Sequence, residues 1–92
     1  MKAAFSRFFT FMYHVYILYS SKCDRYYTGC AEDVIKRLER HNAGYVAATW
    51  RCLPWEIKYT ESFITKAEAL KRELKIKRKK SRVYLEWLIR NQ

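Results

Sequence analysis

HVYILYSSKCDRYYTGC, at residues 14–30, contains two short runs of apolar and aromatic side chains with a polar segment between them. Residues 14–19 are rich in β-branched and aromatic side chains, which favour a strand, and YYTGC at 26–30 has the same character. The polar segment SSKCDR at 20–25 is typical of a turn. We therefore expect an antiparallel hairpin joined by a loop of about five or six residues.

A helix and a third strand are expected to follow the hairpin. The helix is predicted over residues 33–43, with Asp33 as its N-cap and Gly44 beyond its end. WEIKYTESF, at 55–63, alternates apolar and polar side chains, which predicts a strand with one face on a core. The apolar face of the helix is predicted to contain Val34, Ile35 and Leu38.

Two more helices are expected at the end of the chain. Thr65 and Glu68 form a capping box for a helix that continues to residue 80, and Ser81 is the expected N-cap of a last helix at 82–90. The resulting order, β-β-α-β-α-α, predicts the α/β (α+β) class, a small three-stranded antiparallel sheet flanked by helices. The apolar residues predicted to face inward are Ala67, Leu70 and Leu74, and those predicted to cover the sheet or a partner are Val83, Leu85, Trp87 and Leu88.

Length and charge limit the class of protein. A chain of 92 residues allows one domain. The net charge of +10 favours a polyanionic partner, with nucleic acid favoured over an anionic membrane surface. No run approaches the roughly 20 apolar residues that span a bilayer, so we expect no membrane partner.

Residues 1–12 are expected to be an N-terminal extension of a domain at residues 13–92. MKAAFSRFFTFM resembles a weak signal peptide, but Arg7 interrupts its apolar stretch and no small-residue cleavage site follows. Two interpretations stay open. Either Met12 is the start and the residues before it are dispensable, or these residues form an extra strand or helix.

The cysteines are an odd set of three, Cys23, Cys30 and Cys52, and their spacing matches no zinc motif. A disulfide framework is poorly supported by this pattern. We therefore expect reduced thiols and a cytoplasmic location.

Five residues on three expected elements are candidates for chemistry. Tyr16 and Tyr27 lie on the hairpin strands, and Arg37 and His41 lie about 40° apart on the first helix. Glu73 lies about 80° from the centre of the apolar stripe of the next helix, at the boundary of the core. A carboxylate for one Mg²⁺, a guanidinium for phosphoryl charge and a hydroxyl that positions water are sufficient groups for phosphodiester hydrolysis.

Basic residues gather around Glu73. Nine of the 19 Lys and Arg lie in residues 66–82 beside two acidic residues, so this segment supplies +7 of the +10. Lys66, Lys77 and Lys80 share the side of Glu73, and we expect them to contact nucleic acid. Structural explanations also stay open: Glu73 can be an i,i+4 partner of Lys77, the basic run a solvated face, and the tyrosines half-buried core residues.

Together these residues resemble the GIY-YIG nuclease superfamily, and within it a small single-domain bacterial group (UPF0213-like). The two signatures match residues 14–16, His-Val-Tyr, and residues 27–29, Tyr-Thr-Gly. The arginine of the superfamily matches Arg37, ten positions after the second tyrosine, and its histidine matches His41. Its metal-binding glutamate matches Glu73, which closes an EALKRE pattern. The resemblance covers about residues 13–90.

The resemblance implies a GIY-YIG fold and metal-dependent endonuclease activity on DNA. Tyr16 or Tyr27 would orient or deprotonate the attacking water, Arg37 would stabilise the transition state, and His41 would assist proton transfer or bind a phosphate. Glu73 would hold Mg²⁺ or Mn²⁺. A chain this short has no room for a separate sequence-reading domain, so we expect selectivity for DNA structure or for single strands, in DNA repair or processing.

Other residues near the signatures are expected to contact the nucleic acid. A side chain at Gly29 would obstruct the approach of a phosphate, so we include Gly29 among the nucleic-acid-binding residues. Residues 47–50, AATW, are expected in a loop over the site, where Thr49 or Trp50 would contact a nucleotide. A place for Trp50 in the core stays open.

Two alternative functions stay open. Cys30 stands where excinuclease relatives carry a lysine, which favours a non-catalytic nucleic-acid-binding module. The apolar last helix, with Tyr84, Trp87 and Leu88, favours a subunit that docks on a larger protein partner or forms a homodimer.

Overall fold

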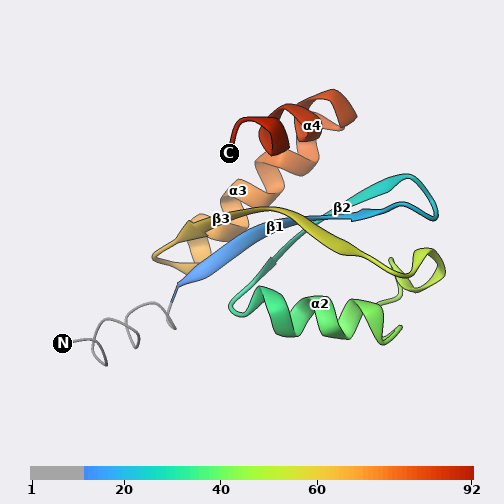
Figure 1. The fold of residues 1–92 in the computed structure, drawn as a ribbon. Helices are drawn as coiled ribbons and strands as arrows, with labels where there is room; N and C mark the ends of the chain where they lie inside the picture. The colour runs from blue at the N-terminus through green and yellow to red at the C-terminus, as the bar shows by residue number, and fades with distance from the viewer. Residues whose placement is uncertain (1–11) are drawn as a thin grey trace.

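The computed structural model describes residues 12–92, in which the order of elements confirms the predicted β-β-α-β-α-α arrangement (Figure 1). A short 3₁₀ turn, η1, precedes the third strand. The strands are β1 (Tyr13–Ser20), β2 (Arg25–Ala31) and β3 (Glu56–Phe63), and the helices are α2 (Val34–Asn42), η1 (Trp50–Cys52), α3 (Lys66–Lys79) and α4 (Arg82–Arg90).

Each predicted N-cap is formed. Asp33 accepts a hydrogen bond from the Lys36 amide at 3.0 Å, and Ser81 accepts one from the Tyr84 amide at 3.1 Å. Thr65 accepts from the Glu68 amide at 3.2 Å, and its hydroxyl donates to the Glu68 carboxylate at 2.9 Å. These bonds satisfy amides that have no partner inside the first turn of a helix, which fixes where the helices begin.

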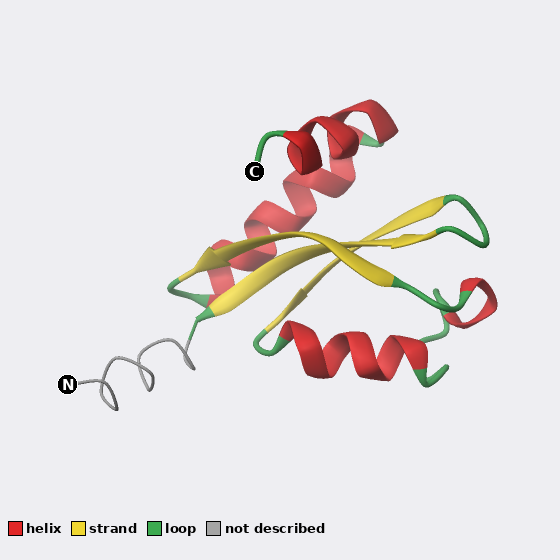
Figure 2. Ribbon diagram, viewed as in Figure 1, coloured by secondary structure: helices red, strands yellow, loops and turns green. Residues whose placement is uncertain are grey.

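The three strands form an antiparallel sheet in the order β2-β1-β3, so β1 is central and β2 is an edge strand (Figure 2). The register pairs Tyr16 with Gly29 and Leu18 with Tyr27. Because alternate residues of a strand face opposite sides, Tyr16 and Tyr27 lie on one face of the sheet.

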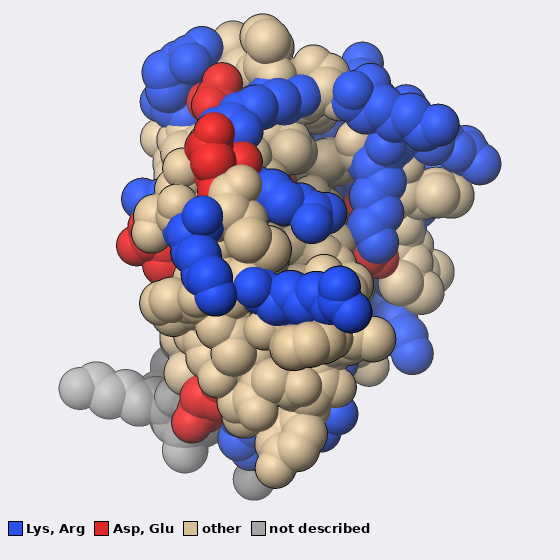
Figure 3. Space-filling view, turned by 90° about the vertical axis from the view of Figure 1, so that its right-hand side faces the viewer, with Lys and Arg blue, Asp and Glu red and all other residues tan. Residues whose placement is uncertain are grey.

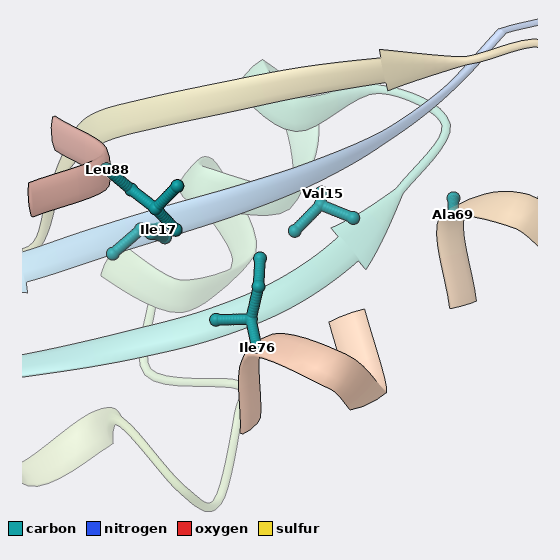
Figure 4. Packing of buried hydrophobic residues seen from close by; sticks show 5 residues of the cluster. All are labelled: Val15, Ile17, Ala69, Ile76 and Leu88. Carbon is teal, nitrogen blue, oxygen red and sulfur yellow. The ribbon is translucent and has the colours of Figure 1, made fainter. Parts of the chain in front are cut away.

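Helices cover both faces of the sheet, with α2 on one side and α3 and α4 on the other (Figure 1). The first core joins the sheet to α3 and α4, as Figure 4 shows. The second core lies on the side of Tyr16. The buried residues of the first core are Val15, Ile17, Ala69, Ile76 and Leu88, and those of the second are Tyr16, Leu18, Ala31, Cys52 and Trp55.

The predicted inward faces of the helices are partly wrong. On α3 the buried residues are Ala69 and Ile76, whereas Leu70 and Leu74 are 44% and 47% exposed. The two pairs lie on faces about 100–160° apart, so the helix has two short apolar stripes. The stripe that contains Ala69 packs against the sheet, because the small side chain of Ala69 allows the helix to approach closely. Ala67 is exposed as well, and so are Ile35 on α2 and Val83 and Trp87 on α4.

The expectation that the cysteines are reduced is also wrong, because Cys23 and Cys52 form a disulfide. It joins the β1–β2 turn to η1, 29 positions along the chain, and Cys30 is free. Ser20 reinforces this junction, since its hydroxyl donates to the Cys52 carbonyl at 2.6 Å. The pairing follows from the loop before β3 folding back under the hairpin turn, a contact that cysteine spacing does not contain.

Two expectations concern the N-terminal residues and the membrane. The two interpretations of residues 1–11 fall outside the described residues. Within residues 12–92, each helix is too short or too polar to cross a membrane.

Candidate active site

The five candidate residues meet at the β2 edge of the sheet. Tyr16 and Tyr27 project from β1 and β2 toward α2, and their ring centroids are 6.5 Å apart. His41 on α2 packs its ring against both tyrosines, at 6.0 Å and 5.1 Å between centroids. Arg37 lies one turn earlier on α2, and Glu73 comes from α3 on the other side of the sheet.

The charges of Arg37 and Glu73 both affect Tyr16. Burial, followed by Tyr27 and Glu73, raises the pKa of Tyr16 to about 12, although the Arg37 guanidinium acts in the opposite direction. The phenol of Tyr16 is therefore protonated at neutral pH. The other four candidates, which come from three further elements of the chain, each contact Tyr16 or affect its pKa.

A chain of hydrogen bonds runs inward from Tyr16. The Tyr16 hydroxyl lies 3.0 Å from Nε2 of His41, and Nδ1 of His41 lies 2.8 Å from the Thr49 hydroxyl. Thr49 also donates to the Val46 carbonyl at 3.4 Å. We assign the histidine tautomer from this network. Because the Thr49 proton goes to Val46, Nδ1 carries the hydrogen and Nε2 accepts from Tyr16.

His41 is buried and electrically neutral. Its exposed fraction is 1%, and burial, followed by the charge of Arg37, lowers the pKa of its imidazole. A neutral imidazole with its Nδ1–H held by a partner is able to accept a proton at Nε2. His41 therefore accepts the hydrogen bond of the Tyr16 hydroxyl, and its predicted role in proton transfer or phosphate binding stays a prediction.

Thr49 is a site residue whose role was not predicted from the sequence. It was expected to contact a nucleotide, but it is only 1% exposed and its hydroxyl is used by His41. Trp55 holds it in place, since the indole donates to the Thr49 carbonyl at 2.8 Å. The available signal was a hydroxyl residue within the apolar segment 46–50. Trp50, by contrast, is 48% exposed, and its contact with a nucleotide stays a prediction.

The structure explains the need for glycine at position 29 by a contact other than the predicted one. A Cβ at this position would collide with the hydroxyl end of the Tyr16 ring, which crosses over Gly29 on the neighbouring strand. Gly29 is itself buried. The requirement for glycine therefore comes from Tyr16, and the proposed contact between Gly29 and nucleic acid stays a prediction.

Glu73 lies at the boundary of the core, as predicted. Its side chain is 15% exposed, and its carboxylate forms an ion pair with Lys77 at 2.8 Å. The Lys77 ammonium also lies 6.0 Å from the centroid of the Tyr27 ring. The structural explanation of Glu73 as an i,i+4 partner of Lys77 is therefore realised, and it coexists with a position beside the tyrosines.

Charged residues from two helices affect Cys30, which stands where a lysine was expected. Burial and the charge of Glu73 raise the pKa of its thiol, whereas Lys66, Arg37 and Lys77 lower it. Three cations and one carboxylate therefore act on this position, and compensation for the lysine by these cations stays a prediction. They come from α2 and α3 rather than from the strand. Basic side chains also spread over much of the face shown in Figure 3.

Lys80 is not part of this group. It forms the C-cap of α3 and lines a cavity at the opposite end of β2. Of the three lysines predicted to contact nucleic acid, Lys66 and Lys77 therefore lie beside the five candidates, and Lys80 lies farther along α3.

One carboxylate is available for a metal ion. Among residues 12–92 there is no cluster of three or more His, Cys, Asp or Glu able to form an all-protein site. Mg²⁺ often binds through one or two carboxylates, with waters and substrate phosphates completing its octahedron. Glu73 fits this mode because it is partly exposed and lies next to the tyrosines, while its ion pair with Lys77 competes for the same oxygen.

The sequence of this chain is similar to a known domain family and to several known proteins. The GIY-YIG catalytic domain family matches residues 12–86. A UPF0213 protein of Halobacterium salinarum is 45% identical over 67 residues, which cover 72% of this chain and 86% of the relative. A UPF0213 protein of Staphylococcus saprophyticus is 42% identical over 66 residues, covering 71% of this chain and 79% of the relative.

A solved structure is similar as well. The solution NMR structure of a UPF0213 protein from Bacillus halodurans aligns with a TM-score of 0.56 and 30% identity. The alignment covers 88% of this chain and 85% of the other.

Proposed function

This chain belongs to the GIY-YIG catalytic domain family, and from that premise we propose that it is a metal-dependent endonuclease that hydrolyses DNA phosphodiester bonds. The observation that supports the proposal most is the meeting of two tyrosines, an arginine, a histidine and a glutamate at the edge of β2. A pure binding surface gains nothing from a carboxylate placed among its lysines.

The two tyrosines have different surroundings, which suggests different roles. Tyr16 is bonded to His41 and has a raised pKa, so it is a poor base by itself. We propose that Tyr16 passes its proton to Nε2 of His41 as its oxygen accepts one from the attacking water. Tyr27, which is more exposed, would orient that water. The hydroxide then attacks phosphorus, the P–O bond to the leaving oxygen breaks, and solvent protonates the leaving oxygen.

The charged residues would stabilise the phosphoryl group. Arg37 offers a planar donor to the oxygens on which charge develops, and Lys66 and Lys77 add positive charge around Cys30. Glu73 would hold Mg²⁺ or Mn²⁺, and the bound ion would supply Lewis acidity toward a phosphoryl oxygen.

Cleavage with matched variants tests this proposal. The protein is incubated with Mg²⁺ or Mn²⁺ and single-stranded, duplex or branched DNA, beside Glu73→Gln and the control Glu68→Gln. The control makes the same change of charge on the same helix and keeps the capping box, because glutamine also occurs at that position. We expect the parent and Glu68→Gln to cut and Glu73→Gln to bind without cutting. Equal cutting by all three would remove Glu73 from the mechanism.

The same assay separates the alternative functions. If no variant cuts while all bind DNA with a steep salt dependence, the protein is a non-catalytic nucleic-acid-binding module. Selectivity for DNA structure or single strands, and a link to DNA repair, stay predictions that the panel of substrates addresses. Homodimer formation or partner docking through α4 also stays a prediction; Val83 and Trp87 on that helix are 73% and 50% exposed.

A cytoplasmic location stays a prediction as well. It was based partly on reduced cysteines, and the Cys23–Cys52 disulfide removes that part of the argument.

A further inference from the structure

A cavity of about 310 Å³ lies away from the five candidate residues, between the start of β2 and the turn that joins α3 to α4. Its volume is at the lower end of the range of ligand pockets. Its lining includes Arg25, Tyr26, Lys77, Lys80, Arg82 and Leu85.

Some of the charged side chains that line this cavity form ion pairs, and others do not. Arg82 is held by Asp24 at 2.6 Å and by Glu86 at 3.3 Å, so its charge and that of Asp24 are compensated. Arg25 and Lys80 line the same cavity, and within residues 12–92 neither forms an ion pair. Two uncompensated cations facing one concave site favour an anionic ligand.

The backbone at Lys80 supports a role for its side chain. Lys80 ends α3 in the left-handed conformation, with φ of 48°. Glycine is the usual residue at such a position, because it has no Cβ to strain. A lysine there costs stability but places an ammonium group at the cavity.

Lys77 links the cavity to the candidate active site. This residue lines the cavity and also pairs with Glu73 at 2.8 Å. Glu73 and Lys80 are seven residues apart on α3, which is about 10.5 Å along the helix axis. A strand of B-form DNA winds around its axis as it rises about 3.4 Å per nucleotide, so its neighbouring phosphates are farther apart than this rise and the separation corresponds to about one or two nucleotides.

We propose that this cavity is a second phosphate subsite, which holds a backbone phosphate about one or two nucleotides from the cleaved bond on the same strand. Arg25 and Lys80 bind the phosphate oxygens, and Tyr26 and Leu85 provide an apolar wall for the adjacent sugar. The proposal rests on the proposed function for the position of the cleaved bond. It gives the short chain a way to fix the register of a strand without reading bases.

Neutral phosphate analogues test the subsite. Binding of a fluorescent oligonucleotide is measured by anisotropy without divalent metal, with one methylphosphonate linkage moved along the strand. The parent is compared with Arg25→Gln/Lys80→Gln and with the control Lys71→Gln/Lys75→Gln, which removes two charges from another part of α3. Thermal unfolding of all three checks that they are folded.

We expect two positions of interference in the parent, about one or two nucleotides apart, each weakening binding about tenfold. The second should disappear in Arg25→Gln/Lys80→Gln and persist in the control. The same two positions in all three proteins would overturn the proposal. So would inorganic phosphate shifting the NMR signals of the cavity residues when the oligonucleotide does not, because the ligand would then be a free phosphate.

The result is independent of cleavage. If the protein shows this interference pattern but does not cut DNA with Mg²⁺ or Mn²⁺, the enzyme proposal fails and the subsite remains. If it cuts DNA but shows interference only at the cleaved bond, the subsite fails and the enzyme proposal remains.

Discussion

Replacing Thr49 with valine tests the hydrogen-bond chain behind Tyr16. The two side chains have nearly the same shape, so the substitution removes a hydroxyl with little change in volume. Thr49 lies 2.8 Å from Nδ1 of His41 and is 1% exposed, so water has no access to replace it. The loop should keep its position, because Trp55 holds the backbone carbonyl of residue 49 rather than its side chain.

The expected loss follows from the imidazole nitrogen that is left without a partner. An unsatisfied buried donor costs about 1–3 kcal/mol, and each 1.4 kcal/mol is a factor of ten in an equilibrium constant. Thr49→Val should therefore lower the free energy of unfolding by about 1–3 kcal/mol. In a domain of this size each 1 kcal/mol lowers Tm by about 4–8 °C.

Urea unfolding and ¹⁵N NMR of the histidine ring provide the measurements. In the parent, we expect the Nδ1–H tautomer of His41; in Thr49→Val, we expect a mixture of tautomers and slower DNA cleavage with unchanged binding. Thr49→Ser is the matched control, since it keeps the hydroxyl and loses a methyl group. If Thr49→Ser changes the tautomer and the cleavage rate as much as Thr49→Val does, the hydroxyl has no role and the proposed relay is refuted.

Three further predictions concern the same face of the sheet. Gly29→Ala should displace the Tyr16 ring and lower the free energy of unfolding by about 1–3 kcal/mol in a urea titration; unchanged stability would contradict the packing described above. Reduction of the Cys23–Cys52 disulfide should lower the free energy of unfolding by about 3–4 kcal/mol, because the two cysteines are 29 residues apart in the sequence. The urea midpoints with and without reductant must therefore differ. The lowered pKa of His41 means that the unfolded chain takes up a proton at higher pH than the folded one, so stability should fall as pH drops below about 6.5. His41→Gln should weaken that dependence between pH 7.5 and 5, and an identical slope in parent and variant would rule out this source.

The surroundings of Cys30 show how a motif position can be filled from another element. The sequence shows a cysteine where a lysine was expected, which favoured the binding-module alternative. In the folded chain Lys66 and Lys77 from α3 and Arg37 from α2 act on this thiol. Positive charge from two helices therefore acts on this position although the lysine is absent, and the Glu73 carboxylate opposes it.

Much of the fold could be predicted from local chemistry. Alternating apolar residues, a polar turn and three N-caps act within a few residues of one another, so they predicted the strands and helices with ends correct to within one or two residues. The signature spacing identified Tyr16, Tyr27, Arg37 and His41 as candidates. The strands, the turn and the helix N-caps depend on backbone geometry at short range, so the sequence by itself determined them.

Other features depend on contacts between distant segments, and only the tertiary structure decided them. Three features are of this kind: the face of α3 that packs on the sheet, the Cys23–Cys52 disulfide and the hydrogen bond between Thr49 and His41. Each joins segments that are separated in the sequence, and a local pattern of residues does not show that they are close in space. Gly29 illustrates the difference best. Its identity was visible in the sequence, but its reason is the Tyr16 ring on the neighbouring strand, because a side chain there would occupy the space that the phenol fills.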